Sequence, residues 1–188
     1  TTDMSFKTIG NSANSYEGET IAAAGDVNGD GYGDFLIGAP QSNTAKGYAK
    51  IFAGDGAAQG SLAEMAYLVG ETDNDFFGET ILGAQDLNAD GYDDILVGAH
   101  GHDNVGAVYV FYGPLSGTID LSAGDMASGV LSGDTGVSGL NSDFGRTIAL
   151  SDINGNGTAD ILVGSGRYDT SGASDVGAVF LFTSTFMP

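Results

Sequence analysis

Apolar residues along this chain gather in short runs that alternate with stretches of Gly, Asp and Asn. The runs are four to seven residues long and rich in Val, Ile, Phe and Tyr. Strands have this length and composition, whereas a helix spaces its apolar residues every three to four positions over about ten residues or more. Residues 60–65 and 121–126 are the segments that could form a helical turn. The pattern therefore predicts an all-β protein.

The same order of runs recurs three times. Acidic stretches begin at Asp26, Asp86 and Asp152, which lie 60 and 66 residues apart. Two apolar runs follow each stretch, at 35–39 and 47–52, at 95–99 and 106–111, and at 161–165 and 177–182. A fourth run aligns at 7–10, 67–70 and 130–133. A repeat of about 60 residues and four strands has the size of one β-propeller blade.

We expect a single domain of three four-stranded antiparallel blades, with repeats at 1–65, 66–128 and 129–188. The chain starts with a run of the fourth-strand type and stops after a run of the third-strand type. If the fourth strand is the outer edge of the preceding blade, the last blade lacks its outer strand, and the first strand of this chain or of another copy would supply it. Closed propellers have about four to eight blades. Three blades therefore predict a partial propeller or half of an oligomeric ring.

Each acidic stretch has the ligand spacing of a calcium loop. Oxygen-bearing side chains at positions one, three, five and nine, with Gly at six and an inward carbonyl at seven, can surround a hard cation. A helix-loop-helix calcium hand is ruled out, because Ile37, Val97 and Val163 replace its Glu at position twelve. Plain hairpin turns would explain the glycines but not the spaced carboxylates. The candidate ligands are Asp26, Asn28, Asp30, Tyr32 and Asp34, then Asp86, Asn88, Asp90, Tyr92 and Asp94, then Asp152, Asn154, Asn156, Thr158 and Asp160.

We expect three calcium sites, of which the third is the weakest. Asn156 stands where the other loops have Asp30 and Asp90, so the third loop carries two carboxylates. The affinity expected for sites of the extracellular type is about 10⁻⁴ to 10⁻³ M. The chain has 25 acidic and 5 basic residues and a net charge of -20, which excludes nucleic acid as a partner and disfavours anionic membrane surfaces. It has no Cys, so it holds no disulfide and no thiolate metal site.

These residues resemble the FG-GAP repeat family, whose repeats form the blades of the integrin alpha-subunit β-propeller. The Phe-Gly landmark is present at 77–78 and 144–145, and the Gly-Ala-Pro landmark at 38–40, while Glu17 takes the place of the first Phe. The resemblance implies structural calcium on one face of the blades and recognition by loops on the other face. The third repeat is one residue shorter between Gly145 and Asp152, so we expect an altered bulge in its first strand.

We expect a calcium-binding, secreted or cell-surface module for adhesion, protein–protein interaction or assembly, without catalytic activity. Its partners would be other copies or neighbouring blades, through edge strands, and a protein or glycan on the loop face, without insertion into a membrane. Two alternatives stay open: a lectin-like or polysaccharide-acting propeller, and a structural subunit of a calcium-dependent filament. His100, His102 and Asp103 could hold a metal or act as acid and base, but Gly166 at the equivalent place in the third repeat favours a solvated loop.

Overall fold

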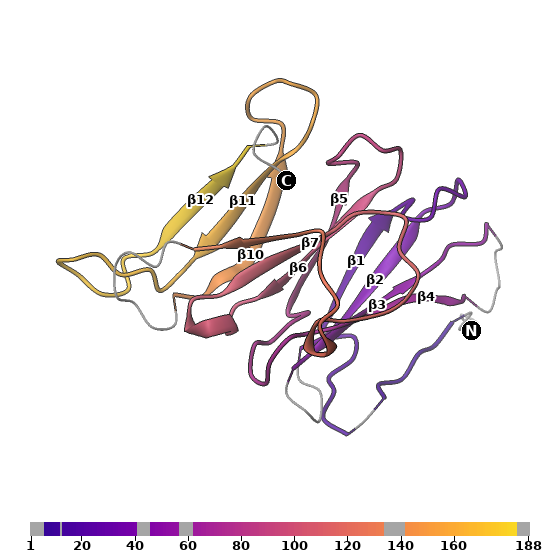
Figure 1. The fold of residues 1–188 in the computed structure, drawn as a ribbon, viewed down its shortest axis with the longest axis horizontal. Helices are drawn as coiled ribbons and strands as arrows, with labels where there is room; N and C mark the ends of the chain where they lie inside the picture. The colour runs from indigo at the N-terminus through magenta and orange to yellow at the C-terminus, as the bar shows by residue number, and fades with distance from the viewer. Residues whose placement is uncertain (1–5, 12, 41–45, 57–61, 134–141, 184–188) are drawn as a thin grey trace, which may run out of the picture.

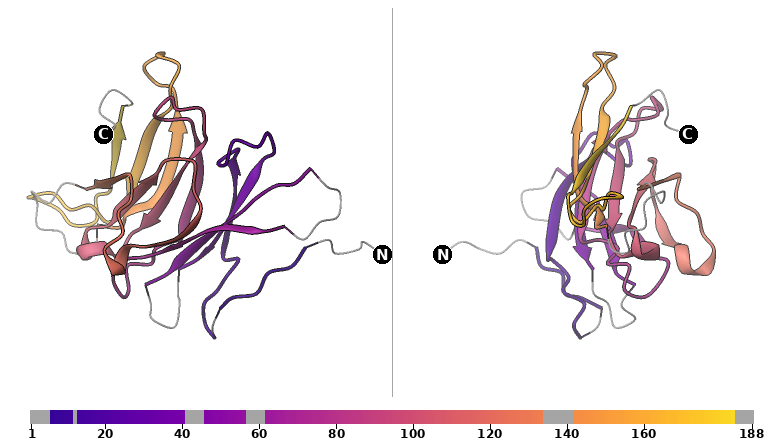
Figure 2. Two further views of the ribbon diagram at one scale, coloured as in Figure 1. Left: turned by 45° about the vertical axis from the view of Figure 1, so that its right-hand side comes forward. Right: turned by 90° about the vertical axis from the view of Figure 1, so that its left-hand side faces the viewer.

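The three repeats fold into three β-sheets that stand side by side like blades (Figure 1). The computed structural model describes residues 6–11, 13–40, 46–56, 62–133 and 142–183. In the left view of Figure 2 the first and third sheets lie on opposite sides of the second. The strands are β1 (Thr20–Gly25), β2 (Asp34–Ala39), β3 (Tyr48–Phe52), β4 (Glu64–Val69), β5 (Thr80–Gln85), β6 (Asp94–Ala99), β7 (Ala107–Phe111), β8 (Gly117–Asp120), β9 (Gly129–Ser132), β10 (Phe144–Ser151), β11 (Asp160–Ser165) and β12 (Ala178–Phe182). Two short 3-10 helices are η1 (His102–Asn104) and η2 (Leu121–Ala123).

The strand order confirms the all-β, antiparallel blades. The first sheet has the order β1-β2-β3-β4-β8, the second β5-β6-β7-β9 and the third β10-β11-β12. The fourth-type runs at 67–70 and 130–133 fall in β4 and β9, which pair with the third strands of the preceding sheets. In the described part of the chain the third sheet has no such outer strand. The expected place of the fourth strand, at the outer edge of the preceding blade, is therefore confirmed for β4 and β9.

Strand β8 is a departure from the four-stranded pattern. It comes from the segment between β7 and β9 of the second sheet, yet it pairs with the outer edge of β4 in the first sheet, and it does so in parallel. Leu121, which follows it in η2, is buried in the core between these two sheets. The segment covers the exposed edge of the first sheet, which would otherwise be open to pairing with another chain.

Two apolar cores hold the three sheets together. One lies between the first and second sheets and the other between the second and third. Val108 and Val110 of β7 are 0% and 1% exposed because the third sheet covers them. Their equivalents in β12, Val179 and Leu181, are 72% and 47% exposed. The free face of the third sheet therefore has the same apolar character as the faces that form blade contacts.

The glycines of the family landmarks lie where backbones of neighbouring blades touch. A methyl group on Gly38 would collide with the carbonyl oxygen of Gly78, and one on Gly98 with the carbonyl oxygen of Gly145. The Thr20 hydroxyl donates a hydrogen bond to the same Gly78 carbonyl at 2.8 Å. Only glycine allows so close an approach of two backbones. The Gly-Ala segment of one blade is thereby fitted to the Phe-Gly segment of the next.

The shortened third repeat has the altered bulge that its length predicts. In the first two sheets the register of the first strand skips one residue, Ala24 in β1 and Ala84 in β5. In β10 pairing continues without a break from Thr147 to Ser151, and the irregularity lies instead between Phe144 and Thr147. Removal of one residue thus deletes the bulge near the acidic loop and keeps the pairing beyond it.

Glu17, which replaces the Phe of the landmark, is matched by a second replacement in the first blade. In the second blade, Phe77 of the Phe-Gly landmark packs edge-on against Tyr109 at 5.5 Å between ring centroids. Phe144 packs in the same way on Phe180 at 5.2 Å. In the first blade the residue of β3 at the Tyr109 position is Lys50. Its Nζ lies 2.8 Å from Oε2 of Glu17, so an ion pair replaces the aromatic pair.

This ion pair is buried and fully hydrogen-bonded. The side chains of Lys50 and Glu17 are 4% and 3% exposed. Burial acts to raise the pKa of Glu17, but hydrogen bonds from Lys50, Thr8 and Tyr48 lower it overall. Burial likewise acts to lower the pKa of Lys50, but the hydrogen bond and charge of Glu17 raise it overall. Both groups are therefore held in their charged forms.

Residues 7–10 lie in the place of an outer strand but do not form one. A methyl group on Gly10 would contact Glu17, just as methyl groups on Gly70 and Gly133 would contact the Phe residues of the next blades. The segment nevertheless has no strand pairing, so the predicted strand at 7–10 is wrong. Phe6 packs edge-on against Phe35 and Phe52 at 5.7 and 5.2 Å and covers part of the first sheet.

A second polar network joins two loops of the second blade. Nδ1 of His102 lies 3.0 Å from Oδ2 of Asp75 and 3.2 Å from the Tyr109 hydroxyl, which donates a hydrogen bond to Glu71. The bond with Asp75 raises the pKa of His102 above its usual value, although burial opposes it, and the charges of Asp75, Asp103 and Glu71 add to the rise. A protonated His102 therefore stabilises this end of the blade.

Exchange of the buried ion pair for an aromatic pair should show strong coupling. Glu17→Phe alone leaves the buried Lys50 cation with only the exposed Glu64 carboxylate at 3.5 Å, and should lower the free energy of unfolding by about 3–5 kcal/mol. Lys50→Tyr alone leaves Glu17 unpaired and should cost a similar amount. The double variant recreates the aromatic pair of the second blade and should recover most of that loss in urea unfolding. A double variant whose loss is the sum of the two single losses would contradict the equivalence of the two pairs.

Stability should fall as the pH rises through the raised pKa of His102. The folded protein binds this proton more tightly than the unfolded chain does, whose His pKa is near 6.5. The contribution is complete below about pH 6.5 and is lost above it, as the pH passes the folded pKa. Urea unfolding from about pH 5.5 to 8.5 measures it, and His102→Gln should remove it. Carboxyl groups titrate in the wild type and in His102→Gln alike, so the effect of His102 is the difference between their two pH profiles of stability. Identical profiles would refute the effect.

Candidate metal centre

The three acidic stretches lie at the same end of the three sheets. Each connects the first strand of a sheet to the second, between β1 and β2, β5 and β6, and β10 and β11 (Figure 1). Their glycines at position six, Gly31, Gly91 and Gly157, have φ angles of 90°, 94° and 90°. These left-handed conformations, which favour glycine, make the tight turn that the spacing predicts.

The first Asp of each loop is the centre around which the backbone winds. Oδ1 of Asp26 accepts hydrogen bonds from the N–H groups of Gly29 and Asp30 at 2.8 and 3.0 Å, and Oδ2 accepts one from Gly31 at 2.9 Å. Asp152 makes the same three contacts in the third loop. The loop amides therefore orient this carboxylate.

The Asp at position nine anchors the loop to the end of the third strand. Asp34, Asp94 and Asp160 are buried. The oxygens of Asp94 accept hydrogen bonds from the N–H groups of Leu87 at 2.7 Å and Gly113 at 2.9 Å. Asp34 accepts from the equivalent amides of the first blade. This residue therefore has a structural role besides the predicted role as a ligand.

Burial, with neighbouring charges, raises the pKa values of Asp34 and Asp94. Burial raises the pKa of Asp94 to about 6, and the charges of Asp90 and Asp86 act in the same direction. The pKa of Asp34 is raised for the same reasons, burial first and then the charges of Asp30 and Asp26. A divalent cation among these oxygens would reverse the effect. The donors are all oxygen atoms, so the residues fit a hard cation such as calcium.

The side chains of the loops do not converge into a metal cluster. Among the described residues, no three acidic or imidazole groups are close enough to hold an ion. In the first two loops the amide of Asn28 or Asn88 donates a hydrogen bond to the carboxylate at position five. In the third loop position five is Asn156, and the amide of Asn154 turns to Oδ1 of Asp160 at 3.0 Å instead. The fifteen candidate ligands thus lie in three equivalent turns, and their role as ligands stays a prediction.

A residue outside the predicted ligand set joins the first two loops. Asp93, at position eight of the second loop, accepts a hydrogen bond from the N–H of Asp26 and donates one to its carbonyl oxygen. Position eight is Gly33 in the first loop and Ala159 in the third. This difference among otherwise similar loops is the one signal in the sequence that singles out Asp93.

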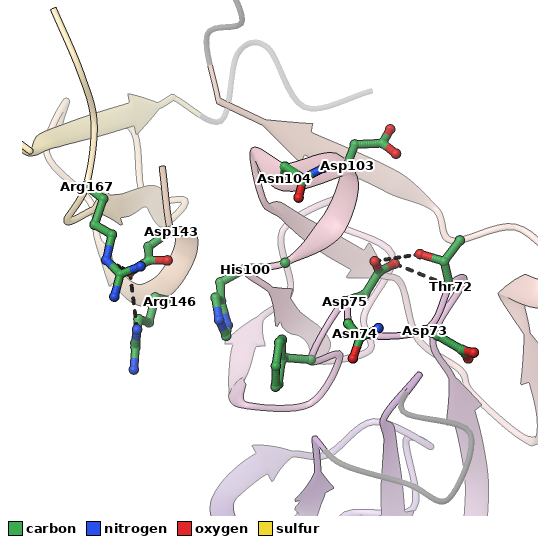
Figure 3. A pocket seen from close by; sticks show the side chains of 12 residues that line it. Thr72, Asp73, Asn74, Asp75, His100, Asp103, Asn104, Asp143, Arg146 and Arg167 are labelled. Atoms are coloured by element: carbon green, nitrogen blue, oxygen red, sulfur yellow. Dashed lines mark hydrogen bonds and ion pairs between the residues drawn. The ribbon is translucent and has the colours of Figure 1, made fainter. Parts of the chain in front are cut away.

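A pocket of about 570 Å³ lies at the opposite end of the sheets, between the second and third blades (Figure 3). Phe76 and His100 stack at 4.7 Å on one side of it. On the other side, Asp143 is shared by Arg146 and Arg167, at 3.2 and 3.4 Å. The side chains of His100 and His102 are 14% and 18% exposed, whereas that of Asp103 is 86% exposed, so their loop is solvated in part. Sequence analysis missed this pocket because its residues come from two blades.

Within the described residues, the structure contains no helix of the length and apolarity needed to span a membrane.

The chain is similar to integrin alpha subunits over most of its length. It is 32% identical to integrin alpha-4 of Xenopus laevis over 88% of this chain, and 34% identical to integrin alpha-5 of Xenopus laevis over 84%. It is 30% identical to integrin alpha pat-2 of Caenorhabditis elegans over 80%. The chain spans 16%, 15% and 13% of the length of these three proteins.

The FG-GAP repeat profile matches the chain in three places, residues 18–58, 77–111 and 144–182. Each match contains one acidic loop and the first three strands of one sheet. The resemblance inferred from the landmarks is thereby confirmed, and the chain belongs to the FG-GAP repeat family.

Proposed function

We propose that this chain is a calcium-stabilised, non-catalytic part of an extracellular β-propeller that acts in adhesion or another protein–protein interaction. The observation that carries the proposal is the repeated loop, with the same oxygen-bearing residues wound in the same turn at one end of three blades. The similarity to integrin alpha subunits supports an extracellular adhesion role.

Calcium would bind the carboxylate and amide oxygens of positions one, three, five and nine and the carbonyl oxygen of position seven. Burial raises the pKa of Asp94 to about 6, and the charges of Asp90 and Asp86 add to the rise. A cation in this loop would stabilise the charged form of Asp94. The third loop should bind most weakly, since Asn156 carries no charge and the Asn154 amide already faces Asp160. At calcium concentrations of one to ten times the dissociation constant, each site adds about 0.4–1.4 kcal/mol of stability.

The pocket at the other end of the sheets is the candidate recognition surface. The guanidinium groups of Arg146 and Arg167 are half exposed or more and can donate hydrogen bonds to a polar partner. A glycan could use the Phe76 and His100 stack, as the lectin-like alternative requires.

The exposed faces of the first and third sheets fit further blades of the same kind. On the third sheet Val179 and Leu181 occupy the positions by which the second sheet contacts its neighbour. On the first sheet Ile21 is 75% exposed, whereas its equivalent Ile81 is buried against the preceding sheet. These faces would be covered by blades of a longer chain or of a second copy, which includes the filament alternative.

Asp86→Asn should lower the melting temperature more in millimolar calcium than in chelator. The substitution removes a charge from the second loop and keeps one of the two oxygens that accept the N–H groups of Asp90 and Gly91, so the lost hydrogen bond gives a smaller loss in both conditions. The expected loss in calcium is roughly 1–5 °C by differential scanning calorimetry. Asp73→Asn, an exposed acid at the other end of the blade, is the control for charge alone. An equal loss in calcium and in chelator would mean that the loop is a turn and not a calcium site.

Light scattering should show whether two copies use the free faces. In millimolar calcium we expect a discrete multimer, because the apolar face around Val179 is otherwise left in water. Val179→Lys should reduce the mass to that of one chain, whereas Ser174→Lys, at an exposed polar position, should not. A polymer would support the filament alternative. A wild-type monomer would rule out self-association and leave further blades of a longer chain to cover these faces.

A further inference from the structure

The loops of the first and second blades are joined by two reciprocal hydrogen bonds. Oδ2 of Asp93 accepts the N–H of Asp26 at 2.7 Å, and the N–H of Asp93 donates to the carbonyl oxygen of Asp26 at 3.1 Å. Asp26 is the first candidate ligand of the first loop, and Asp93 lies between Tyr92 and Asp94, two candidate ligands of the second. The bonds therefore connect the backbones of the two candidate sites directly.

Close packing around these bonds strengthens the connection. A methyl group on Gly25 would overlap the Asp93 carboxylate, so only a glycine leaves room for it. A methyl group on Gly29 would lie 2.6 Å from Cε1 of Tyr92, so the ring of the second loop rests on the backbone of the first. Asp93 and Tyr92 thus contact the first loop at two points, on either side of its turn.

We propose that Asp93 couples the two loops, so that a cation bound in one raises the affinity of the other. The proposal rests on the calcium binding proposed above. A cation in the second loop would fix the backbone from Tyr92 to Asp94, and Asp93 would then hold Asp26 in the conformation that the first loop needs for binding. Most of the entropy loss from ordering both loops then occurs when the first ion binds, so the second ion binds more tightly. Coupling of this kind is reciprocal.

The third loop provides an internal contrast. Ala159 takes the place of Asp93 and has no side-chain acceptor, and Thr158 takes the place of Tyr92. Gln85, with φ of 57°, stands where the first blade has Gly25. Among the described residues, no backbone–backbone hydrogen bond joins Asp86 to the third loop. The third site should therefore bind independently of the second.

A simpler effect of charge has to be separated from this coupling. The carboxylate of Asp93 adds a negative charge beside the first loop, which would attract a cation there whether or not the second loop is filled. Asp93→Asn removes that charge but keeps an oxygen that can accept the N–H of Asp26. Asp93→Ala removes both. Neither substitution alters a candidate ligand.

Calcium titration by calorimetry tests the coupling in the full chain. Asp152→Asn disables the third loop and leaves the first two, and Asp86→Asn added to it leaves the first loop alone. We expect the affinity of the first loop to fall about 5-fold or more when the second loop is disabled. In the Asp93→Ala background, which keeps only the backbone bond from the N–H of residue 93, this difference should shrink, and in the Asp93→Asn background it should persist.

Four results would overturn the coupling or what it rests on. An affinity of the first loop that does not depend on the second refutes it. A dependence that Asp93→Ala does not reduce means that a contact other than the Asp93 carboxylate transmits it. A uniform loss of affinity in both Asp93 variants, without a change in dependence on the second loop, assigns the effect to charge. Absence of calcium binding in the wild-type chain would instead refute the proposed calcium sites, with circular dichroism showing that the chain is folded.

Discussion

Contact between the backbones of neighbouring blades is the constraint on which the rest of this structure depends. Gly38 and Gly98 approach the carbonyl groups of Gly78 and Gly145 so closely that no side chain fits between them. The sheets are thereby held in a fixed offset at one end. At the other end, the acidic loops of the first two blades come within hydrogen-bond distance, as the contact of Asp93 with the Asp26 amide shows. The landmark glycines and the acidic loops thus make the contacts between neighbouring blades at opposite ends of the sheets.

The repeat itself made much of the fold predictable. Short apolar runs between turn residues predict strands, and one missing residue predicts the lost bulge of β10, since both depend only on local spacing. Contacts in which the blades differ were not predictable. Glu17 is visible as a departure from the Phe-Gly landmark, but Lys50 becomes its partner only through the register of β3. The parallel pairing of β8 depends on an open edge in another blade, which no local pattern records.

Only part of the candidate site was predictable from the sequence. Spacing alone predicts which side chains of each loop carry oxygen and that glycine must make the turn, and the structure has those turns. Spacing does not predict that the Asn154 amide turns to Asp160 while Asn28 turns to Asp30, because the acceptor at position five has lost its charge. Nor does it predict the role of Asp93, whose hydrogen-bond partner lies in the preceding blade.

The hydrogen bonds of the loops also limit what a cation can do here. The amides of Gly29, Asp30 and Gly31 orient the carboxylate of Asp26. Burial raises the pKa of Asp94 to about 6, and the charges of Asp90 and Asp86 add to the rise. A cation would therefore stabilise the charged forms of these carboxylates, with a modest gain in each blade. In a stack of repeats, stability is the sum of such gains and of the contacts between neighbours. An ion that also fixes the Asp93 contact would contribute to both terms, and most strongly at the interface between the first two blades.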